Sequence, residues 1–265
     1  MIYYRIKYNC KIAEIWYNFD EKPDINTDIL RYKFVSDFKK KPYSLEELFT
    51  LRLDLSKSSE ELFSSIKKNT RYEINRAQNR DKIKCQTFFL KNETNFDKIN
   101  NFINYFNKFA DTKGRNHLNY QDIEQFYITN NFCIRYSSSE DDSIIYCMHS
   151  YVISDNIARL LQSASLFREA NDTEFKNLNA RANRLLHWDD ILFFKKDNYS
   201  FYDFGGWYGG QELKEQLLIN TFKESFGGEK KSEYSYIVPV TLKGFFYIRS
   251  RDFSKNIISI FRKHV

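Results

Sequence analysis

The sequence predicts an α/β protein in which strands and helices alternate along the chain. Two observations favour this class. From residue 131 onward, the apolar pattern gives the order strand, strand, strand, helix, strand, helix, strand. The composition is also that of a folded chain, because 42% of its 265 residues are hydrophobic and 18% are aromatic. This length suffices for one large domain or two small ones.

The first fifty residues contain three short runs in which apolar and polar side chains alternate, at 2–8, 11–19 and 30–38. Alternation with a period of two is typical of strands, so we expect a small antiparallel sheet here. A further strand is predicted at 51–55.

A helix is predicted to begin after Ser58, because Ser58 and Glu61 have the spacing of a capping box. Its apolar residues are Leu62, Phe63, Ile66, Ile74 and Ala77. Basic residues lie on its other sides, and a solvated face is the ordinary explanation for such a pattern.

The rest of the chain alternates between the two kinds of pattern. Further strands are predicted at 84–90, 132–137, 143–154, 158–167, 200–204 and 234–240. Further helices are predicted at about 95–110, 120–129, 179–196, 213–226 and 253–265. The three strands after residue 131 should form a meander.

The net charge and the spacing of the cysteines limit the kinds of ligand and site that we expect. The net charge is +6, which suits an anionic small molecule, a nucleic acid or merely a solvated lysine-rich surface. The four cysteines are widely spaced, so we expect neither a disulfide framework nor a zinc site. No apolar run is long enough for a signal peptide or a membrane span, and we expect a cytoplasmic protein.

Glycine is concentrated in one region, because six of the eight glycines fall between residues 205 and 228. Gly205 and Gly206 end a predicted strand, where a substrate could lie against bare backbone. A tight strand-to-helix turn is the alternative, and for Gly209 and Gly210 it is the preferred one.

Four motifs carry a resemblance to a known family: Arg71–Ala77, Ala182–Trp188, Tyr202–Gly206 and Phe222–Gly228. In this order they resemble the Fem-type peptidoglycan aminoacyltransferases and their shorter acyltransferase relatives within the GNAT superfamily, over about residues 50–230. The resemblance implies a GNAT-type mixed, splayed central sheet flanked by helices, with a partial second GNAT-like unit at the N-terminus. It divides the chain into an acceptor-side subdomain, 1–130, and an acyltransferase core, 131–265.

The resemblance also implies an activity. Shorter relatives resemble N-acyltransferases that use acyl-CoA and the amino group of a nucleotide-linked amino sugar for surface polysaccharides such as the O-antigen of lipopolysaccharide. Coenzyme A would then be the co-substrate, and no metal, nucleic acid or integral membrane segment would be needed. We also expect a monomer.

Two departures from the family pattern bear on the donor. The GNAT pyrophosphate loop is glycine-rich, and 168–181 contains no glycine. The long charged arm that larger Fem enzymes associate with aminoacyl-tRNA is also missing. The alternatives are therefore a Fem-like transfer from aminoacyl-tRNA to a peptidoglycan precursor, and a non-catalytic module that binds nucleic acid.

Two residues are candidate bases for the acceptor amine. Asp203 lies at the end of the 200–204 strand, where it could instead cap its own turn. His149 lies within a predicted strand, where a core histidine is the alternative.

Candidate ligand contacts follow from the same resemblance. The helix start at Asn177, Asn179, Ala180 and Arg181 would bind the CoA pyrophosphate, with Lys223 as a further contact. On the acceptor side, Arg71 or Arg76 would contact a diphosphate, Gly205 and Gly206 would line the site, and Trp207 or Tyr208 would stack on a nucleobase.

Overall fold

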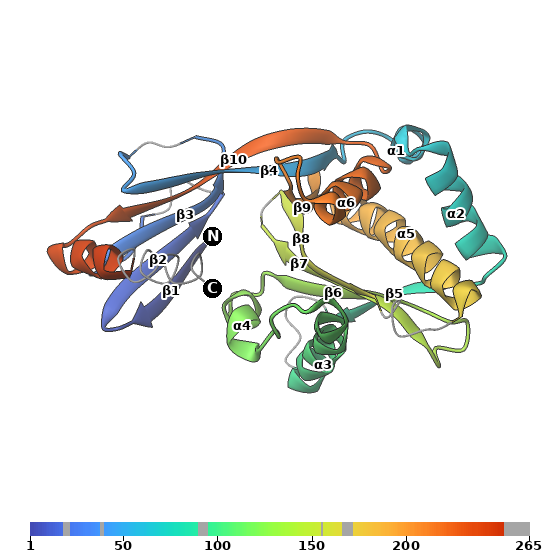
Figure 1. Cartoon of the computed structure of the whole chain (residues 1–265), viewed down its shortest axis with the longest axis horizontal. Helices are drawn as coiled ribbons and strands as arrows, with labels where there is room; N and C mark the ends of the chain where they lie inside the picture. Colours follow the sequence, from blue (N-terminus) through green and yellow to red (C-terminus); the bar gives the residue numbers. More distant parts are fainter. Residues whose placement is uncertain (18–21, 38–39, 90–94, 155, 166–171, 252–265) are drawn as a thin grey trace. The chain divides into compact units, whose positions relative to one another are not determined.

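A computed structural model describes residues 1–17, 22–37, 40–89, 95–154, 156–165 and 172–251. The chain forms two compact units (Figure 1). Unit 1 comprises Met1–Phe49 and Lys231–Val265, and unit 2 comprises Thr50–Lys230. These boundaries differ from the division predicted at residue 130. The helix predicted at 253–265 lies outside the described residues.

Two strands belong to both units, because β4 (Ser44–Asp54) begins in unit 1 and β10 (Glu229–Pro239) begins in unit 2. The other strands of unit 1 are β1 (Ile2–Lys7), β2 (Cys10–Trp16) and β3 (Ile29–Val35). Their order is β1-β2-β3-β10-β4.

The prediction of an antiparallel N-terminal sheet is wrong for one pair of strands. β1 and β2 are antiparallel, but β2 and β3 are parallel. A parallel pair needs a connection of about a dozen residues or more, and the chain between Trp16 and Ile29 has that length. β10, which is far away in the sequence, supplies the antiparallel neighbour of β3.

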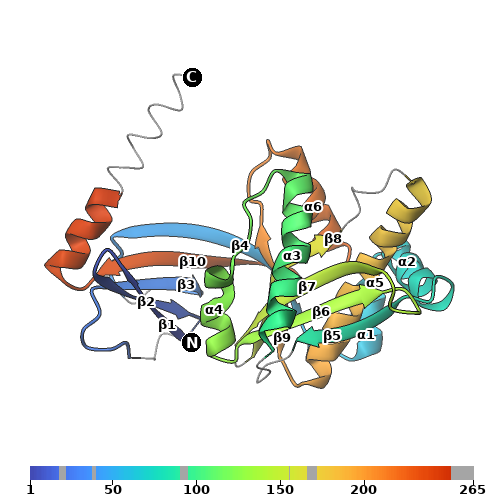
Figure 2. The ribbon, with the colours of Figure 1, turned by 90° about the horizontal axis from the view of Figure 1, so that it is seen from below.

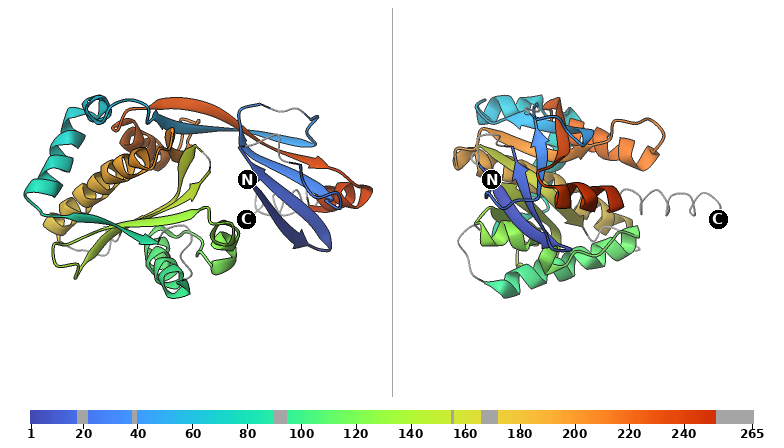
Figure 3. Two further views of the ribbon diagram at one scale, coloured as in Figure 1. Left: turned by 180° about the vertical axis from the view of Figure 1, so that it is seen from behind. Right: turned by 90° about the vertical axis from the view of Figure 1, so that its left-hand side faces the viewer.

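Each face of the unit 1 sheet carries its own apolar cluster. A helix over 242–251 places Ile248 on one face, against Cys10, Ile12 and Ile29 (dark red in Figure 3). The other face buries Ala13, Ile15, Leu30, Tyr32, Val35 and Tyr236.

Unit 2 contains a mixed sheet with the order β4-β9-β8-β7-β6-β5. Its further strands are β5 (Lys84–Phe89), β6 (Phe132–Ser138), β7 (Ile145–Ile153), β8 (Ile157–Ser165) and β9 (Phe201–Trp207). β5 to β8 pair antiparallel, which confirms the predicted meander, and β9 runs parallel to β8.

Helices cover both faces of this sheet. They are α1 (Ser59–Ser65), α2 (Lys68–Asn79), α3 (Phe96–Lys113), α4 (Tyr120–Ile128), α5 (Thr173–Lys196) and α6 (Lys214–Glu224). α5 packs on one face of β5 to β7 and α3 on the other (Figures 1 and 2). α2 lies along α5. The fold class predicted from the sequence is confirmed.

The single helix predicted after Ser58 is in fact two helices. The capping box is present, since Ser58 and Glu61 exchange hydrogen bonds of 2.7 and 3.1 Å. However, buried Ile66 takes an extended conformation and ends α1. Arg71 of α2 then donates to the carbonyls of Ser64 and Ile66, so the break is held by side-chain hydrogen bonds.

α5 begins at Thr173, six residues before the predicted start at residue 179. Asp172 is its N-cap and accepts from the backbone N–H groups of Glu174 and Phe175, at 3.0 and 3.2 Å. The first turn is therefore capped by an acidic side chain, and a second acidic residue, Glu174, follows it.

Candidate functional site

The parallel pairing of β8 and β9 ends early, and this divergence defines the candidate site. Cα partners run from Ile157–Phe201 to Arg159–Asp203. β8 nevertheless continues to Ser165 and β9 to Trp207. Backbone groups of the later half of β8 are thus released from this ladder, as the predicted splayed sheet requires.

Gly205 lies at the point of divergence. Its φ of +69° is in the left-handed region, and a Cβ there would stand 2.7 Å from the carbonyl oxygen of Leu160. Only glycine fits both conditions without strain. The neighbouring Gly206 has open space around it, so the two glycines of the pair have different roles.

Asp203 sits beneath this turn with no exposed surface. Its carboxylate accepts from the Thr50 hydroxyl at 2.5 Å and from the Gly205 backbone N–H at 2.7 Å. It also accepts from Arg159 at 2.9 Å and from Arg52 at 3.1 Å. These contacts correspond to the turn-capping alternative, and the role of Asp203 as a base stays a prediction.

The two arginines decide the charge state of Asp203. Burial alone would raise the pKa of the carboxyl, but Arg159, Arg52 and the hydrogen bonds from Thr50 and Gly205 lower it below its usual value. Asp203 is therefore an ionised carboxylate at neutral pH, held in place by four donors.

Lys223 of α6 reaches the same turn. Its ammonium donates to the carbonyls of Gly206 at 2.5 Å and Gly205 at 3.4 Å. Burial lowers the pKa of Lys223 to about 8, Asp203 opposes this shift, and Arg159 adds to it. The structure thus brings together four residues predicted separately from the sequence: Asp203, Gly205, Gly206 and Lys223.

His149 lies in a second polar network, centred on the buried carboxylate of Asp190. The two oxygens of Asp190 are 2.8 Å from Arg135 Nε and 2.8 Å from His149 Nδ1. His149 Nε2 is 2.9 Å from Asn183 Oδ1. His149 is fully buried with both ring nitrogens engaged, so it resembles a satisfied core histidine, and its role as a base stays a prediction.

Tyrosines extend this network towards β9. Tyr151 donates to Asp190 at 2.5 Å, and its oxygen is 2.9 Å from that of Tyr202. The Tyr202 oxygen is 2.8 Å from His187 Nδ1. Burial, followed by the charges of His149, Lys223 and Arg184, holds the pKa of His187 well below its usual value. His187 is therefore neutral.

The residues predicted to hold the CoA pyrophosphate lie inside α5, not at its start. Asn177 is exposed, and Asn179 is buried with its side-chain oxygen 2.7 Å from Ser165 Oγ. The Ala180 carbonyl accepts from Arg184 at 3.0 Å. Arg181 pairs with Asp81 at 2.5 Å. The helix-start argument therefore fails for these backbone groups, because helical N–H groups past the first turn are already bonded.

The side chains predicted to contact the acceptor already have other partners within unit 2. Arg71 closes the end of α1, and Arg76 lies 3.9 Å from Asp81. Trp207 packs against the core, and Tyr208 donates to Glu212 at 2.8 Å. The roles of these four residues in substrate binding stay predictions.

Sequence reasoning missed the three partners of Asp203 that come from other strands: Thr50, Arg52 and Arg159. In the sequence, these polar residues alternate with apolar ones, as is typical of strands. Charged side chains in alternating strands are expected to face water, so nothing local indicated that both arginines would surround one buried carboxylate.

Within the described ranges, no group of three or more potential metal ligands is present. No helix in this part of the chain is long and apolar enough to cross a membrane. The four cysteines are free thiols.

Comparison with known proteins identifies the fold but no family. No protein-family model matches the chain, and no curated protein does. FemX matches with a TM-score of 0.64 over 89% of this chain and 84% of that chain, at 10% sequence identity. The C-terminal domain of a putative lysylphosphatidylglycerol synthetase from Agrobacterium fabrum matches with a TM-score of 0.57, over 94% and 83%, at 11% identity. The chain therefore shares the overall fold of FemX and of that C-terminal domain.

Proposed function

We propose that the protein is an N-acyltransferase that forms an amide at the divergence of β8 and β9. The observation that supports this most directly is the ladder that ends at Arg159–Asp203, followed by the close approach of Gly205 to Leu160. Backbone N–H groups released there can polarise the carbonyl of an acyl donor. Orientation of the amine against that carbonyl supplies the remaining rate acceleration. The amine attacks the acyl carbonyl directly, the bond from the acyl carbon to the donor's thiol or hydroxyl breaks, and that group leaves. No covalent enzyme intermediate is needed.

Lys223 is the group we favour for removing the proton of the acceptor amine. Unlike Asp203 and His149, which have no exposed surface, Lys223 is only partly buried and lies at the glycine turn. Its pKa of about 8 leaves part of the population neutral near physiological pH. Asp203 and His149 then act as supports for the surrounding backbone and helix.

The first specific proposal follows the sequence motifs. The donor is acyl-CoA, and the acceptor is the amino group of a nucleotide-linked amino sugar used for a surface polysaccharide. A monomeric, cytoplasmic enzyme that needs no nucleic acid and no metal would suit this reaction.

A second candidate is transfer of an amino acid from aminoacyl-tRNA to a peptidoglycan precursor. Two observations favour it. The α5 N-terminus carries Asp172 and Glu174, which repel the phosphates of CoA at that position. The fold also matches that of FemX over 84% of the FemX chain.

The experiment that separates these candidates supplies each donor to the purified protein. Labelled acyl-CoA with a UDP-linked amino sugar, and aminoacyl-tRNA with a peptidoglycan precursor, are each followed by mass spectrometry of the amide product. Under the first proposal, the amide forms from acyl-CoA and activity survives RNase. Activity that disappears with RNase and returns with charged tRNA would establish the second candidate. An amide from neither donor would remove both.

A further inference from the structure

Unit 1 contains a pocket with a volume of about 500 Å³. This lies in the size range of small-molecule sites, about 300–1,000 Å³. β3, β4, β10 and the end of the 242–251 helix contribute its wall. The lining residues that matter here are Arg31, Lys33, Phe34, Ser44, Glu46 and Arg251.

The charges that line this pocket do not balance. Arg31, Lys33 and Arg251 are basic, and Glu46 is the acidic residue among the lining groups. The wall therefore carries two positive charges in excess. An anion with at least two negative charges would neutralise it.

A buried carboxylate under the pocket does not remove this excess. Glu14 has no exposed surface and accepts from Arg5 at 2.7 Å and from Trp16 Nε1 at 2.9 Å. Arg31 and Lys33 are farther from it, at 3.6 and 3.5 Å. Glu14 accepts its hydrogen bonds from Arg5 and Trp16, and Arg5 opposes its charge, while Arg31 and Lys33 lie near it at ion-pair distance.

Two buried donors in the wall point to a ligand. The Nε atoms of Arg31 and Arg251 are buried and have no hydrogen-bond partner within the described part of the chain. Buried N–H groups of this kind are normally paired, and an oxyanion in the pocket would accept from them. Phe34, also in the wall, has a φ of 56°, a strained value that tends to occur at functional sites.

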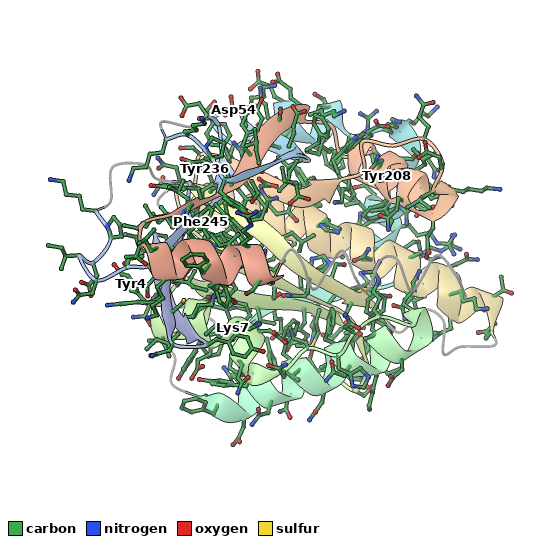
Figure 4. The ribbon with its side chains drawn as sticks, turned by 60° about the vertical axis from the view of Figure 1, so that its left-hand side comes forward. Tyr4, Lys7, Asp54, Tyr208, Tyr236 and Phe245 are labelled. Carbon is green, nitrogen blue, oxygen red and sulfur yellow. The ribbon has the colours of Figure 1, made fainter. Side chains whose placement is uncertain are left out.

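A second cavity of about 410 Å³ adjoins the first at Arg251, which lines both. Lys7, Tyr8 and Tyr247 also line it (Lys7 is labelled in Figure 4). The rings of Tyr8 and Tyr247 are 6.2 Å apart. The second cavity therefore offers aromatic surface to whatever group is attached to the anion.

We propose that the basic pocket of Arg31, Lys33 and Arg251 binds a diphosphate ester. This rests on the proposed function in one respect, since both candidate acceptors could be presented on a diphosphate, either of a nucleotide or of a lipid. A diphosphate carries at least two negative charges, which match the two excess positive charges of the pocket wall. Arg251 lines both cavities, so the group attached to the diphosphate would enter the second cavity beside it.

Calorimetric titration of the full chain with inorganic pyrophosphate, UDP and farnesyl diphosphate tests this inference. We expect pyrophosphate to bind, and the ester that binds more tightly identifies the nucleotide or the lipid source. Arg251→Gln does not remove a partner of Glu14, and it should weaken binding about tenfold or more, the effect of losing one charge-assisted hydrogen bond. Lys11→Gln, which removes a charge from the same unit outside the pocket, is the matched control and should change the Kd less than about twofold.

Absence of binding for all three probes would overturn the inference, as would equal affinities for Arg251→Gln and Lys11→Gln with both variants folded by circular dichroism. The transfer assay is independent of this result. Amide formation without diphosphate binding would refute the proposed role of the pocket and leave the proposed function standing. Diphosphate binding without amide formation would refute the proposed function and leave the pocket standing.

Discussion

Each unit of this protein buries a carboxylate among basic side chains, and the two clusters are built differently. Asp203 in unit 2 accepts four hydrogen bonds of 2.5 to 3.1 Å, two of them from arginines. Glu14 in unit 1 accepts two, from Arg5 and Trp16, and its other basic neighbours stay at 3.5 Å or more.

The difference teaches what a buried charge can be used for. In the Asp203 cluster all four hydrogen bonds are directed at the buried carboxylate, so the carboxylate fixes the glycine turn and the β8–β9 divergence. In the Glu14 cluster, basic groups in excess of the carboxylate line a pocket. The first arrangement fixes backbone geometry, and the second is suited to receive an anion.

The largest expected effect comes from neutralising each carboxylate. Asp203→Asn leaves Arg159, only 4% exposed, without its counter-charge, and we expect a loss of about 3–5 kcal/mol in the free energy of unfolding. Glu14→Gln should cost about 1–3 kcal/mol, because its nearest partner, Arg5, is 42% exposed and can be solvated. Urea unfolding of both variants measures the difference. Equal losses would show that the two clusters are energetically alike.

A smaller effect separates the two glycines above Asp203. Gly205→Ala places a Cβ 2.7 Å from the Leu160 carbonyl at a φ of +69°, and should cost about 1–3 kcal/mol. Gly206→Ala meets open space and should change stability by less than about 0.5 kcal/mol. Transfer activity should follow the same order at a temperature where both variants are folded. If Gly206→Ala is the more damaging, the close approach to Leu160 is not what the turn requires.

The smallest expected effect is a pH dependence from Lys223. Its folded-state pKa of about 8 lies below the ordinary 10.5, so the unfolded chain binds this proton more tightly. Stability relative to Lys223→Gln should therefore rise as pH increases from about 8 towards 10.5, and should be level below pH 8. If Lys223 also deprotonates the amine, kcat should rise through the same pKa and lose that inflection in Lys223→Gln. Parallel pH curves for the two proteins would exclude both effects.

Much of the fold could be predicted from the sequence, since strand alternation, the Ser58 capping box and the meander are local signals. Errors came where a distant contact overrides a local one. Ile66 continues a helical pattern but ends α1, because its carbonyl is bound by Arg71. β2 and β3 are parallel, and the antiparallel neighbour of β3 is β10, about 200 residues later, so the pairing of β3 depends on a segment that local patterns do not indicate.

The candidate site could be predicted only in part. The glycines and Asp203 are marked by composition and position, and Lys223 by a motif. Arg52 and Arg159 carry no such mark, since their burial depends on the convergence of three strands on one carboxylate. The start of α5 was misplaced because Asp172, a good N-cap, stands in a polar stretch that reads as a loop.

The division of the chain into units has a consequence for the order of assembly. Unit 2 is one continuous segment, Thr50–Lys230, and in the sequence the two segments of unit 1 stand before and after it. During synthesis, all of unit 2 leaves the ribosome before the unit 1 part of β10 and the 242–251 helix, which supply Tyr236 and Ile248 to the unit 1 clusters. Unit 2 can therefore fold first, while the N-terminal strands wait for their last partners. Strands β1 to β3, although synthesised before unit 2, are then among the last elements of the two units to reach their native state.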